Sequence, residues 1–356
     1  MNETSLSVGA SATLKLRRVA AWRGIRVLAW DGDVLYGCRA YQLVRLQVAT
    51  REWETVARFR PAWWRNLTSR TTPSYRLVRD GFHALAILAD QTMVGAVPGA
   101  LVTRPPGSDE FQMTHRLRRG TRPLHVTAIP SGSIYWGEYF GNRERAEVHI
   151  FVSIDQGRTW QIGYTFPAGT IRHVHSIVYD RWADCLWILT GDEGSECKVL
   201  RASCDLRSVD VVLAGNQQAR AAAAIPVQEG LYFSTDSPFE KNYIYRLDRA
   251  GNVKLVGDLP SSSIFGCKVG EAMFFSTMIE PSAVNHSRDV QVTGSRDGDN
   301  WQILARWRKD RLPMRYFQYG NAFLPDGENS TLHLAATTIA VDSDDLVTTL
   351  WKVESA

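Results

Sequence analysis

The feature that most constrains this chain is a turn motif, Ser-Ile-Asp-Gln-Gly-Arg-Thr-Trp, at residues 153–160. In such a turn the aspartate bonds backbone donors of its own turn, and the glycine takes a conformation that other residues avoid. We expect the tryptophan to fill the gap between neighbouring sheets. A shorter copy, Ser-Arg-Asp-Gly-Asp-Asn-Trp, lies at 295–301, and residues 203–207 mark a further hairpin without the glycine and tryptophan. The repetition predicts a fold built from similar β-hairpins, in which Asp155 has a structural and not a catalytic role.

Strand-length apolar runs separated by Gly, Pro, Asp and Ser recur along the chain, and no long helical period interrupts them. The pattern predicts an all-β fold. Propeller repeats span about 40 to 50 residues, so 356 residues predict about seven blades in one β-propeller domain. The expected blades cover residues 24–60, 75–118, 122–167, 171–215, 219–260, 261–312 and 315–356.

The last repeat supplies only three expected strands, within residues 317–323, 332–337 and 348–353. The stretch 13–19 alternates as a strand should and precedes the first blade. Pairing it with the C-terminal strand would close the ring and remove two exposed edges. We therefore expect the N-terminal strand to complete the last blade.

The stretch 60–74, which contains Trp63, Trp64, Arg65 and Arg70, is longer than a connection between blades needs. Long loops on a rigid scaffold often carry function. An equally plausible interpretation is that this stretch packs its aromatic side chains as a cover over one face.

Composition excludes several classes of function. The net charge of +4 is too small to indicate nucleic acid or an anionic membrane as a partner. The five cysteines contain no CxxC pair, so neither a disulfide framework nor a structural zinc site is expected. The sequence has no signal peptide or membrane-length apolar run, which predicts a cytoplasmic protein without a membrane partner.

Two classes of charged residue recur at positions where a propeller turns towards its central channel. Arginines precede the expected first strands, and acids follow the second strands. The arginines could bind an acidic sugar while the carboxylates cleave it, or the two classes could pair in a structural ring. The arginines are Arg76, Arg119, Arg122, Arg172, Arg220 and Arg315, and the acids are Glu138, Asp192, Glu196, Asp236, Glu240 and Glu280.

His173 and His175 are two residues apart on an expected strand, which places both imidazoles on one face. Such a pair can share a metal or divide proton-transfer roles. With His125 from the preceding blade and with Glu138 or Asp192, it could bind a divalent cation, although no cofactor is required. The alternative is a set of core histidines bonded between sheets.

Two tyrosines adjoin charged residues. Tyr139 follows Glu138, and Tyr316 follows Arg315. A tyrosine in such a place can act as an activated nucleophile or as an acid.

The motifs also carry a family resemblance. The turns at 153–160 and 295–301 are Asp boxes, and with the stretches Gly-Glu-Tyr at 137–139, Ile-Arg-His-Val-His at 171–175, Thr-Gly-Asp at 190–192 and Ser-Thr-Asp-Ser-Pro at 234–238 they resemble bacterial BNR-repeat proteins of the sialidase-like β-propeller superfamily. The Arg-Ile-Pro motif of true sialidases is absent, so sialidase activity is not expected. Propeller polysaccharide lyases are similar in using His, Tyr and Arg near a uronate, sometimes with a metal on a His-x-His pair.

The resemblance implies a carbohydrate-active propeller that binds and cleaves an acidic, uronate-type oligo- or polysaccharide at the channel mouth. In a lyase, His173 or His175 would remove a proton, the arginines would neutralise the uronate, and Tyr139 or Tyr316 would protonate the leaving oxygen. In a glycoside hydrolase, Glu138, Asp192 or Asp236 would divide the acid and base roles, with Glu280 binding substrate. The alternative is a non-catalytic propeller that binds a glycan or a protein partner with the same charges.

Overall fold

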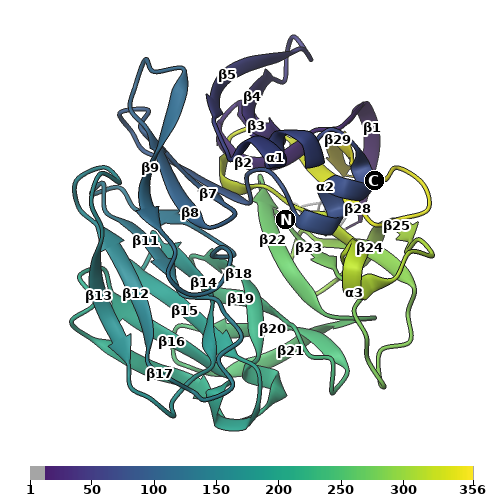
Figure 1. Cartoon of the computed structure of the whole chain (residues 1–356). Helices are drawn as coiled ribbons and strands as arrows, with labels where there is room; N and C mark the ends of the chain where they lie inside the picture. Colours follow the sequence, from purple (N-terminus) through teal and green to yellow (C-terminus); the bar gives the residue numbers. More distant parts are fainter. Residues whose placement is uncertain (1–12, 356) are drawn as a thin grey trace, which may run out of the picture.

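The structure, a computed structural model, describes residues 13–355, and antiparallel β-sheet dominates it (Figure 1). Five sheets have four strands and one has nine. In Figure 1 the colours advance around the molecule, from purple through blue, teal and green to yellow, so sheets that are consecutive in sequence are neighbours in space. Among the described helices, none has the length and apolar character needed to span a bilayer.

Four of the sheets are simple meanders whose strands pair in chain order. Their strands are β10 (Thr127–Ala128), β11 (Ile134–Gly137), β12 (Val148–Ser153) and β13 (Gln161–Phe166); β14 (His173–Asp180), β15 (Cys185–Gly191), β16 (Lys198–Ser203) and β17 (Val209–Ala214); β18 (Ala221–Val227), β19 (Gly230–Thr235), β20 (Asn242–Asp248) and β21 (Val253–Leu259); and β22 (Ser263–Val269), β23 (Ala272–Thr277), β24 (Asp289–Ser295) and β25 (Gln302–Arg308).

The nine-stranded sheet joins two further meanders. They meet where β5 pairs in parallel with β9, through Arg58 opposite Glu110 and Phe59 opposite Phe111. A short parallel strand also pairs with β2 at its other edge. The strands are β2 (Arg26–Gly32), β3 (Val34–Arg39), β4 (Gln42–Gln47), β5 (Trp53–Phe59), β6 (Ala84–Ile87), β7 (Met93–Val97), β8 (Ala100–Arg104), β9 (Glu110–Arg116) and β27 (Asp326–Asn329).

The remaining four-stranded sheet combines both ends of the described chain. Strand β1 (Leu14–Arg23) pairs antiparallel with β29 (Val347–Ser355), which pairs with β28 (His333–Ile339) and then with β26 (Asn321–Phe323). The expected pairing of the N-terminal strand with the C-terminal strand is therefore confirmed. The strand expected over 317–323 is wrong in its first half, because Phe317 ends a short helix, α3 (Met314–Phe317), and residues 318 and 319 have no regular structure.

Residues 60–79, here called the helical insertion, are not the plain loop that the sequence suggested. They contain α1 (Trp63–Thr68) and α2 (Thr72–Val78), with Thr71 as the N-cap of α2. Buried Asp80 holds the insertion to the sheet, because it accepts hydrogen bonds from Arg65 (2.8 Å), Thr68 (2.6 Å) and Tyr41 (2.7 Å).

The first Asp-box turn connects β12 to β13 and has the predicted structural role. Asp155 accepts hydrogen bonds from the Ser153 hydroxyl (2.8 Å) and the Thr159 amide (2.9 Å). Gly157 has a φ of +76°, and a Cβ there would lie 2.6 Å from Val94 Cγ2 in the neighbouring sheet. The Trp160 indole packs beside the neighbouring sheet, and its Nε1 faces a threonine hydroxyl of β9 at 3.4 Å. The turn thus fastens two sheets together.

The hairpin at 203–208 keeps the same bonding without the glycine and tryptophan. The Ser203 hydroxyl donates to Asp205 (2.6 Å), and the Ser208 amide donates to Ser203 (3.1 Å). Buried Leu206 takes the left-handed conformation (φ +59°) and packs on the preceding sheet. The sequence alone did not predict that Leu206 would take over the left-handed conformation and the packing of the missing glycine and tryptophan.

Apolar layers between neighbouring sheets make up the core. One layer, for example, packs Val27, Trp30 and Leu46 of the first meander on Ala335 and Leu350 of the closing sheet. Each sheet thus buries both faces against its neighbours. In each meander the first strand begins, and the second strand ends, at the same end of the molecule, which is called here the channel face. The Asp-box turns, which join third to fourth strands, lie at the opposite end.

Candidate functional site

The candidate site begins at a β-bulge that recurs near the start of the first strands. The pairing of first and second strands skips one residue at Leu28, His175, Ala222 and Ile264 in four different sheets. Bulges re-aim a side chain without breaking the sheet. Since apolar residues fill three of these four positions, the bulge itself does not require a histidine.

His173 and His175 point their rings at each other. Their Nε2 atoms lie 3.0 Å apart. The Nδ1 atom of His173 lies 3.0 Å from the Phe140 carbonyl oxygen, and that of His175 lies 2.8 Å from the Ala221 carbonyl oxygen. Because a carbonyl only accepts, each Nδ1 carries a hydrogen, and each Nε2 points inward between the rings.

Asp192, just after β15, adds a third acceptor to this pair. Its Oδ1 lies 3.4 Å from His173 Nε2 and 3.3 Å from His175 Nε2. These three ligand atoms lie close enough together to hold one metal ion. Two imidazoles and a carboxylate, with both rings oriented by Nδ1–H bonds to carbonyls, form a donor set that suits Zn²⁺ or a similar divalent metal. The three residues are called the His–Asp group below.

Two arginines surround the His–Asp group. Arg172 Nη1 lies 3.1 Å from Asp192 Oδ2, and Arg220 Nη2 lies 3.2 Å from Asp192 Oδ1. Burial alone would raise the pKa of Asp192, but hydrogen bonds from His173 and His175, which form when their Nε2 atoms carry a proton, outweigh burial and hold the pKa far below the usual range. Burial also lowers the pKa of His175. The group therefore combines an ionised carboxylate with a neutral His175 ring.

Two further acids lie next to Arg220. Burial, reinforced by the charge of Glu280, raises the pKa of Asp236 well above its usual value, against the opposing effect of Arg220. Burial likewise raises the pKa of Glu280, whose carboxylate accepts a hydrogen bond from Ser262. Coupled acids of this kind hold a proton between them at higher pH than isolated acids do.

A second part of the channel face carries positive charge without acids. Arg26, at the start of β2, contacts His83 Nδ1 (2.9 Å) and lies over the Phe323 ring. Burial, together with the charges of Arg79 and Arg26, lowers the pKa of Arg122 to about 9. Within residues 13–355, no carboxylate forms an ion pair with Arg26, Arg79 or Arg122, which are called the arginine group.

Tyr139 lies between the two groups. Its ring centroid is 4.3 Å from that of His173. Burial, followed by the charges of Asp236 and Asp192, raises the pKa of Tyr139, whereas Arg122 acts in the opposite direction. The phenol thus stays protonated and can donate a hydrogen bond at neutral pH.

The structure brings together most of the residues that the sequence nominated, with His125 as an exception. His173, His175, Asp192, Arg172, Arg220, Asp236, Glu280, Tyr139 and Arg122 all lie in these two neighbouring parts. His125 instead faces Asp326 Oδ2 at 3.2 Å. The expected metal trio with His125 is therefore wrong, since Asp192 supplies the third ligand atom.

Glu138 is committed to structural bonds. It forms an ion pair with Arg119 and accepts a hydrogen bond from the His149 amide (2.9 Å). Only 4% of its surface is exposed, so its expected catalytic role has no accessible carboxylate to support it.

The expected positions of three other residues are wrong. Arg76 lies on α2, not before a first strand, and is buried between Asp310 (2.6 Å) and Asp345 (3.0 Å). Arg315 and Tyr316 lie on α3, and the Tyr316 side chain is 53% exposed. None of the described ion pairs or hydrogen bonds links Arg315 or Tyr316 to the His–Asp group.

Sequence reasoning missed Arg26 and Arg79. Arg26 directly precedes the first expected strand. It lies two residues before a β-bulge, as His173 and Arg220 do, so its place before a first strand was a usable signal. Arg79 follows α2 in a left-handed conformation, and no signal was available because that helix was not expected.

Comparison with known proteins identifies the fold. No family model matches the sequence, and no curated protein matches it either. The chain is similar to a chain in the crystal structure of a mitotic checkpoint complex, with a TM-score of 0.58 and 10% identity over 99% of this chain and 96% of that one. It is also similar to the Cps50 (Swd1) β-propeller domain of Myceliophteria thermophila, with a TM-score of 0.60 and 10% identity over 95% of this chain and 100% of that domain. The fold is an all-β propeller.

Proposed function

We propose that this propeller binds an acidic ligand at its channel face and does not cleave it. One observation carries the proposal: Arg122 is a partly buried guanidinium that neighbours two arginines and has no carboxylate partner among the described residues. A partly desolvated charge without a counter-charge is costly, and an anionic ligand would supply that counter-charge.

An acidic sugar fits both parts of the channel face. Its carboxylate would bind the arginine group, where guanidinium forks match carboxylates. Its hydroxyls would meet the Tyr139 phenol and the acids Asp236 and Glu280. Asp236 Oδ1 is buried and has no hydrogen-bond partner in the described structure, so a ligand hydroxyl could supply one. We therefore name a uronate-type oligosaccharide as the ligand class.

Binding without cleavage is favoured by how the histidines are used. His173 and His175 are 5% and 2% exposed, and all their ring nitrogens already face protein atoms. A general base must reach the proton that it removes. A binding role also agrees with the fold likeness, since one similar chain is part of a mitotic checkpoint complex.

Calorimetric titration with oligogalacturonate tests the proposal. We expect saturable binding that Arg122→Gln weakens by about tenfold, the loss of one charge-assisted contact. Arg181→Gln, which removes an exposed arginine paired with Glu328, is the matched control and should bind normally. Absence of binding, or an equal loss in both variants, would refute the proposal.

A second candidate is a polysaccharide lyase, which the close contact of the Tyr139 and His173 rings favours. A lyase would release an unsaturated uronate that absorbs ultraviolet light, and Tyr139→Phe would stop that release. A non-catalytic propeller gives no such product while it still binds the oligosaccharide.

We further infer seven blades, with the nine-stranded sheet counted as the two meanders β2–β5 and β6–β9. The short parallel contact at Arg58 and Phe59 that joins the meanders supports this count. We also propose membership of the BNR-repeat proteins, which the Asp-box bonding at Asp155 and at Asp297 supports.

A further inference from the structure

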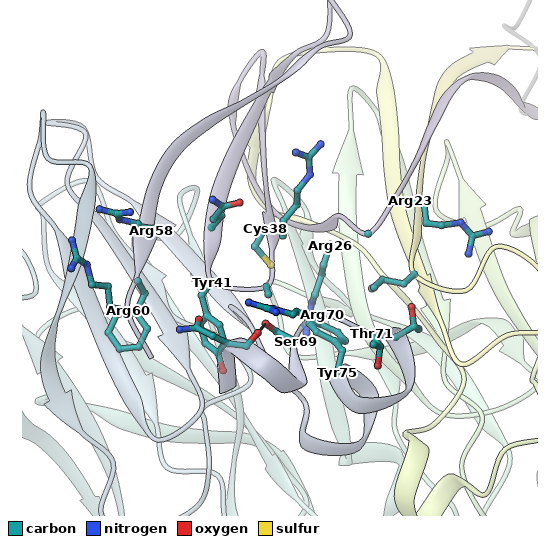
Figure 2. A pocket seen from close by; sticks show the side chains of 18 residues that line it. Arg23, Arg26, Cys38, Tyr41, Arg58, Arg60, Ser69, Arg70, Thr71 and Tyr75 are labelled. Atoms are coloured by element: carbon teal, nitrogen blue, oxygen red, sulfur yellow. Dashed lines mark hydrogen bonds between the residues drawn. The ribbon is translucent and has the colours of Figure 1, made fainter. Parts of the chain in front are cut away.

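A pocket lies on the channel face between the helical insertion and the first meander (Figure 2). Its volume is about 860 Å³, and no Asp or Glu lines it. Figure 2 shows Arg58 and Arg60 on one side, Arg23 on the other, and Arg26 and Arg70 between them. Six arginines line the pocket: Arg23, Arg26, Arg39, Arg58, Arg60 and Arg70.

The positive charge of this pocket is largely uncompensated. Arg58 and Arg60 both bond the same carboxylate, that of Glu110, outside the lining. In the described part of the chain, Arg23, Arg39 and Arg70 form no ion pair. The whole chain carries a net charge of only +4, so this accumulation is local.

The walls are held in place by acids that do not line the pocket. Asp80 is 0% exposed and bonds Arg65, Thr68 and Tyr41, which fixes α1. Arg76 of α2 is bonded to Asp310 and Asp345. Because these carboxylates are used in clamping the insertion, they leave the pocket arginines without partners and the cavity preorganised.

The remaining lining suits a polar small molecule with an aromatic or sugar portion. Tyr41, Phe59 and Tyr75 provide ring surfaces, and Ser69 and Thr72 provide hydroxyls. At the inner end, the Arg26 side chain is buried and its Nε has no hydrogen-bond partner in the described structure. The volume lies within the range of about 300 to 1,000 Å³ that is typical of small-molecule sites.

We propose that this pocket binds a small ligand that carries adjacent phosphate or sulfate groups. Guanidinium forks bind tetrahedral oxyanions through paired hydrogen bonds, and several arginines around one cavity match a multiply charged anion better than a single carboxylate. This inference does not rest on the acidic sugar proposed above, because the pocket shares only Arg26 with the arginine group, and its five other arginines lie outside that group.

Calorimetric titration of the full chain with inorganic pyrophosphate and, separately, with a disulfated disaccharide tests the proposal. We expect one-to-one binding of one or both probes, and the stronger probe identifies the phosphate or the sulfate as the natural group. Arg39→Gln and Arg70→Gln should each weaken binding by about tenfold, the loss of a charged hydrogen-bonding partner. Arg122→Gln should leave this binding unchanged, which distinguishes the pocket from the site proposed above for the acidic sugar.

The matched control is Arg45→Gln. Arg45 is on the same sheet and is paired with Glu54 (3.1 Å), but it does not line the pocket. Circular dichroism of every variant checks that the fold is retained. The proposal is overturned by the absence of saturable binding to both probes, by an equal loss in Arg45→Gln, or by binding that only long nucleic acid produces.

Discussion

The Nε2 atoms of His173 and His175 face each other at 3.0 Å, while the Nδ1 atom of each ring is bonded to a backbone carbonyl. Two lone pairs at this distance repel each other unless a proton or a metal ion lies between them. The Asp192 carboxylate beside them adds a third acceptor. A proton or a metal ion between these three atoms would therefore stabilise the arrangement.

We expect dialysed protein to take up one Zn²⁺ per chain and to unfold at a higher temperature with the metal. His175→Ala should remove this uptake, because it deletes one of the three ligand atoms. The nearby charges of Arg172 and Arg220 will weaken the affinity relative to a site without arginines. Inductively coupled plasma mass spectrometry measures the stoichiometry.

His149→Ala is the control for metal uptake. His149 lies on β12 and is bonded to Thr165 at 3.0 Å, away from the His–Asp group. This variant should bind Zn²⁺ as the parent does. Uptake that survives His175→Ala, or no uptake at all, would show that a shared proton and not a metal satisfies the two rings.

Arg76 is buried and Arg122 is partly buried, and their removal should have different effects. Arg76→Gln leaves Asp345 without an ion-pair partner and leaves Asp310 with Lys309 alone, so it should lower the free energy of unfolding by about 3 kcal/mol. Arg122→Gln relieves repulsion with Arg79 and Arg26 and should change it by less than about 1 kcal/mol. Urea denaturation measures both, and equal losses would contradict the assignment of Arg122 as an unpaired charge.

The pH dependence of stability should reveal Asp236. Burial and the charge of Glu280 raise the pKa of Asp236, so the folded protein keeps a proton that the unfolded chain releases above about pH 4. The contribution to stability is therefore full below about pH 4 and is lost as the pH rises through the raised pKa. Asp236→Asn should unfold less readily than the parent at neutral pH and should show a flatter profile.

Asp155 provides a control of opposite sign. Burial acts to raise its pKa, but hydrogen bonds from Thr159 and Ser153 outweigh that effect and lower the pKa to about 2. Its contribution is present above about pH 4 and is lost as the pH falls towards 2. Asp155→Asn should thus lower stability at neutral pH, and the same sign for both variants in pH-resolved denaturation would refute this account.

Gly157 of the Asp-box turn and Gly132 of the turn between β10 and β11 separate backbone strain from packing. Gly132 and Gly157 both have positive φ values, +89° and +76°, but a Cβ on Gly132 meets no atom within 4 Å. Gly132→Ala should cost about 1 kcal/mol, the penalty of the backbone conformation alone. Gly157→Ala should cost about 3 kcal/mol, since Val94 and Thr103 must also move. Similar costs in thermal denaturation would show that the turn does not fasten the sheets.

Short periodic segments with local signals were predictable from the sequence. The Asp-box turns and the strands follow from alternation and from turn chemistry, which act over a few residues. The pairing of β1 with β29 followed instead from the missing fourth strand of the last repeat and the two edges that ring closure removes. The histidine pair was recognisable for the same reason, because two residues of spacing on a strand fix a common face. The third ligand, Asp192, required the register between β14 and β15, which the sequence left open between Glu138 and Asp192.

The errors arise where a connection is long. Between β5 and β6 the helical insertion replaces a short turn. The first strand of the next meander therefore begins later than expected, and Arg76 does not lie at its start. The cap at Thr71 and the following proline were helix-start signals, but α1 and α2 are too short to show a helical period. Arg315 and Tyr316 were displaced in the same way by α3. The arginine-lined pocket could not be predicted from the sequence, because it depends on which carboxylates form ion pairs with the insertion and so do not line the pocket.

The pairing of β1 with β29 has a consequence for how the chain is made. During synthesis β1 leaves the ribosome well before β29, because more than three hundred residues separate the partners Arg17 and Lys352. Until β29 has been made, β1 lacks this partner for its backbone hydrogen bonds and presents an open edge. This sheet therefore closes only in a product that contains β29, and a product that stops short of β29 leaves an edge available for aggregation.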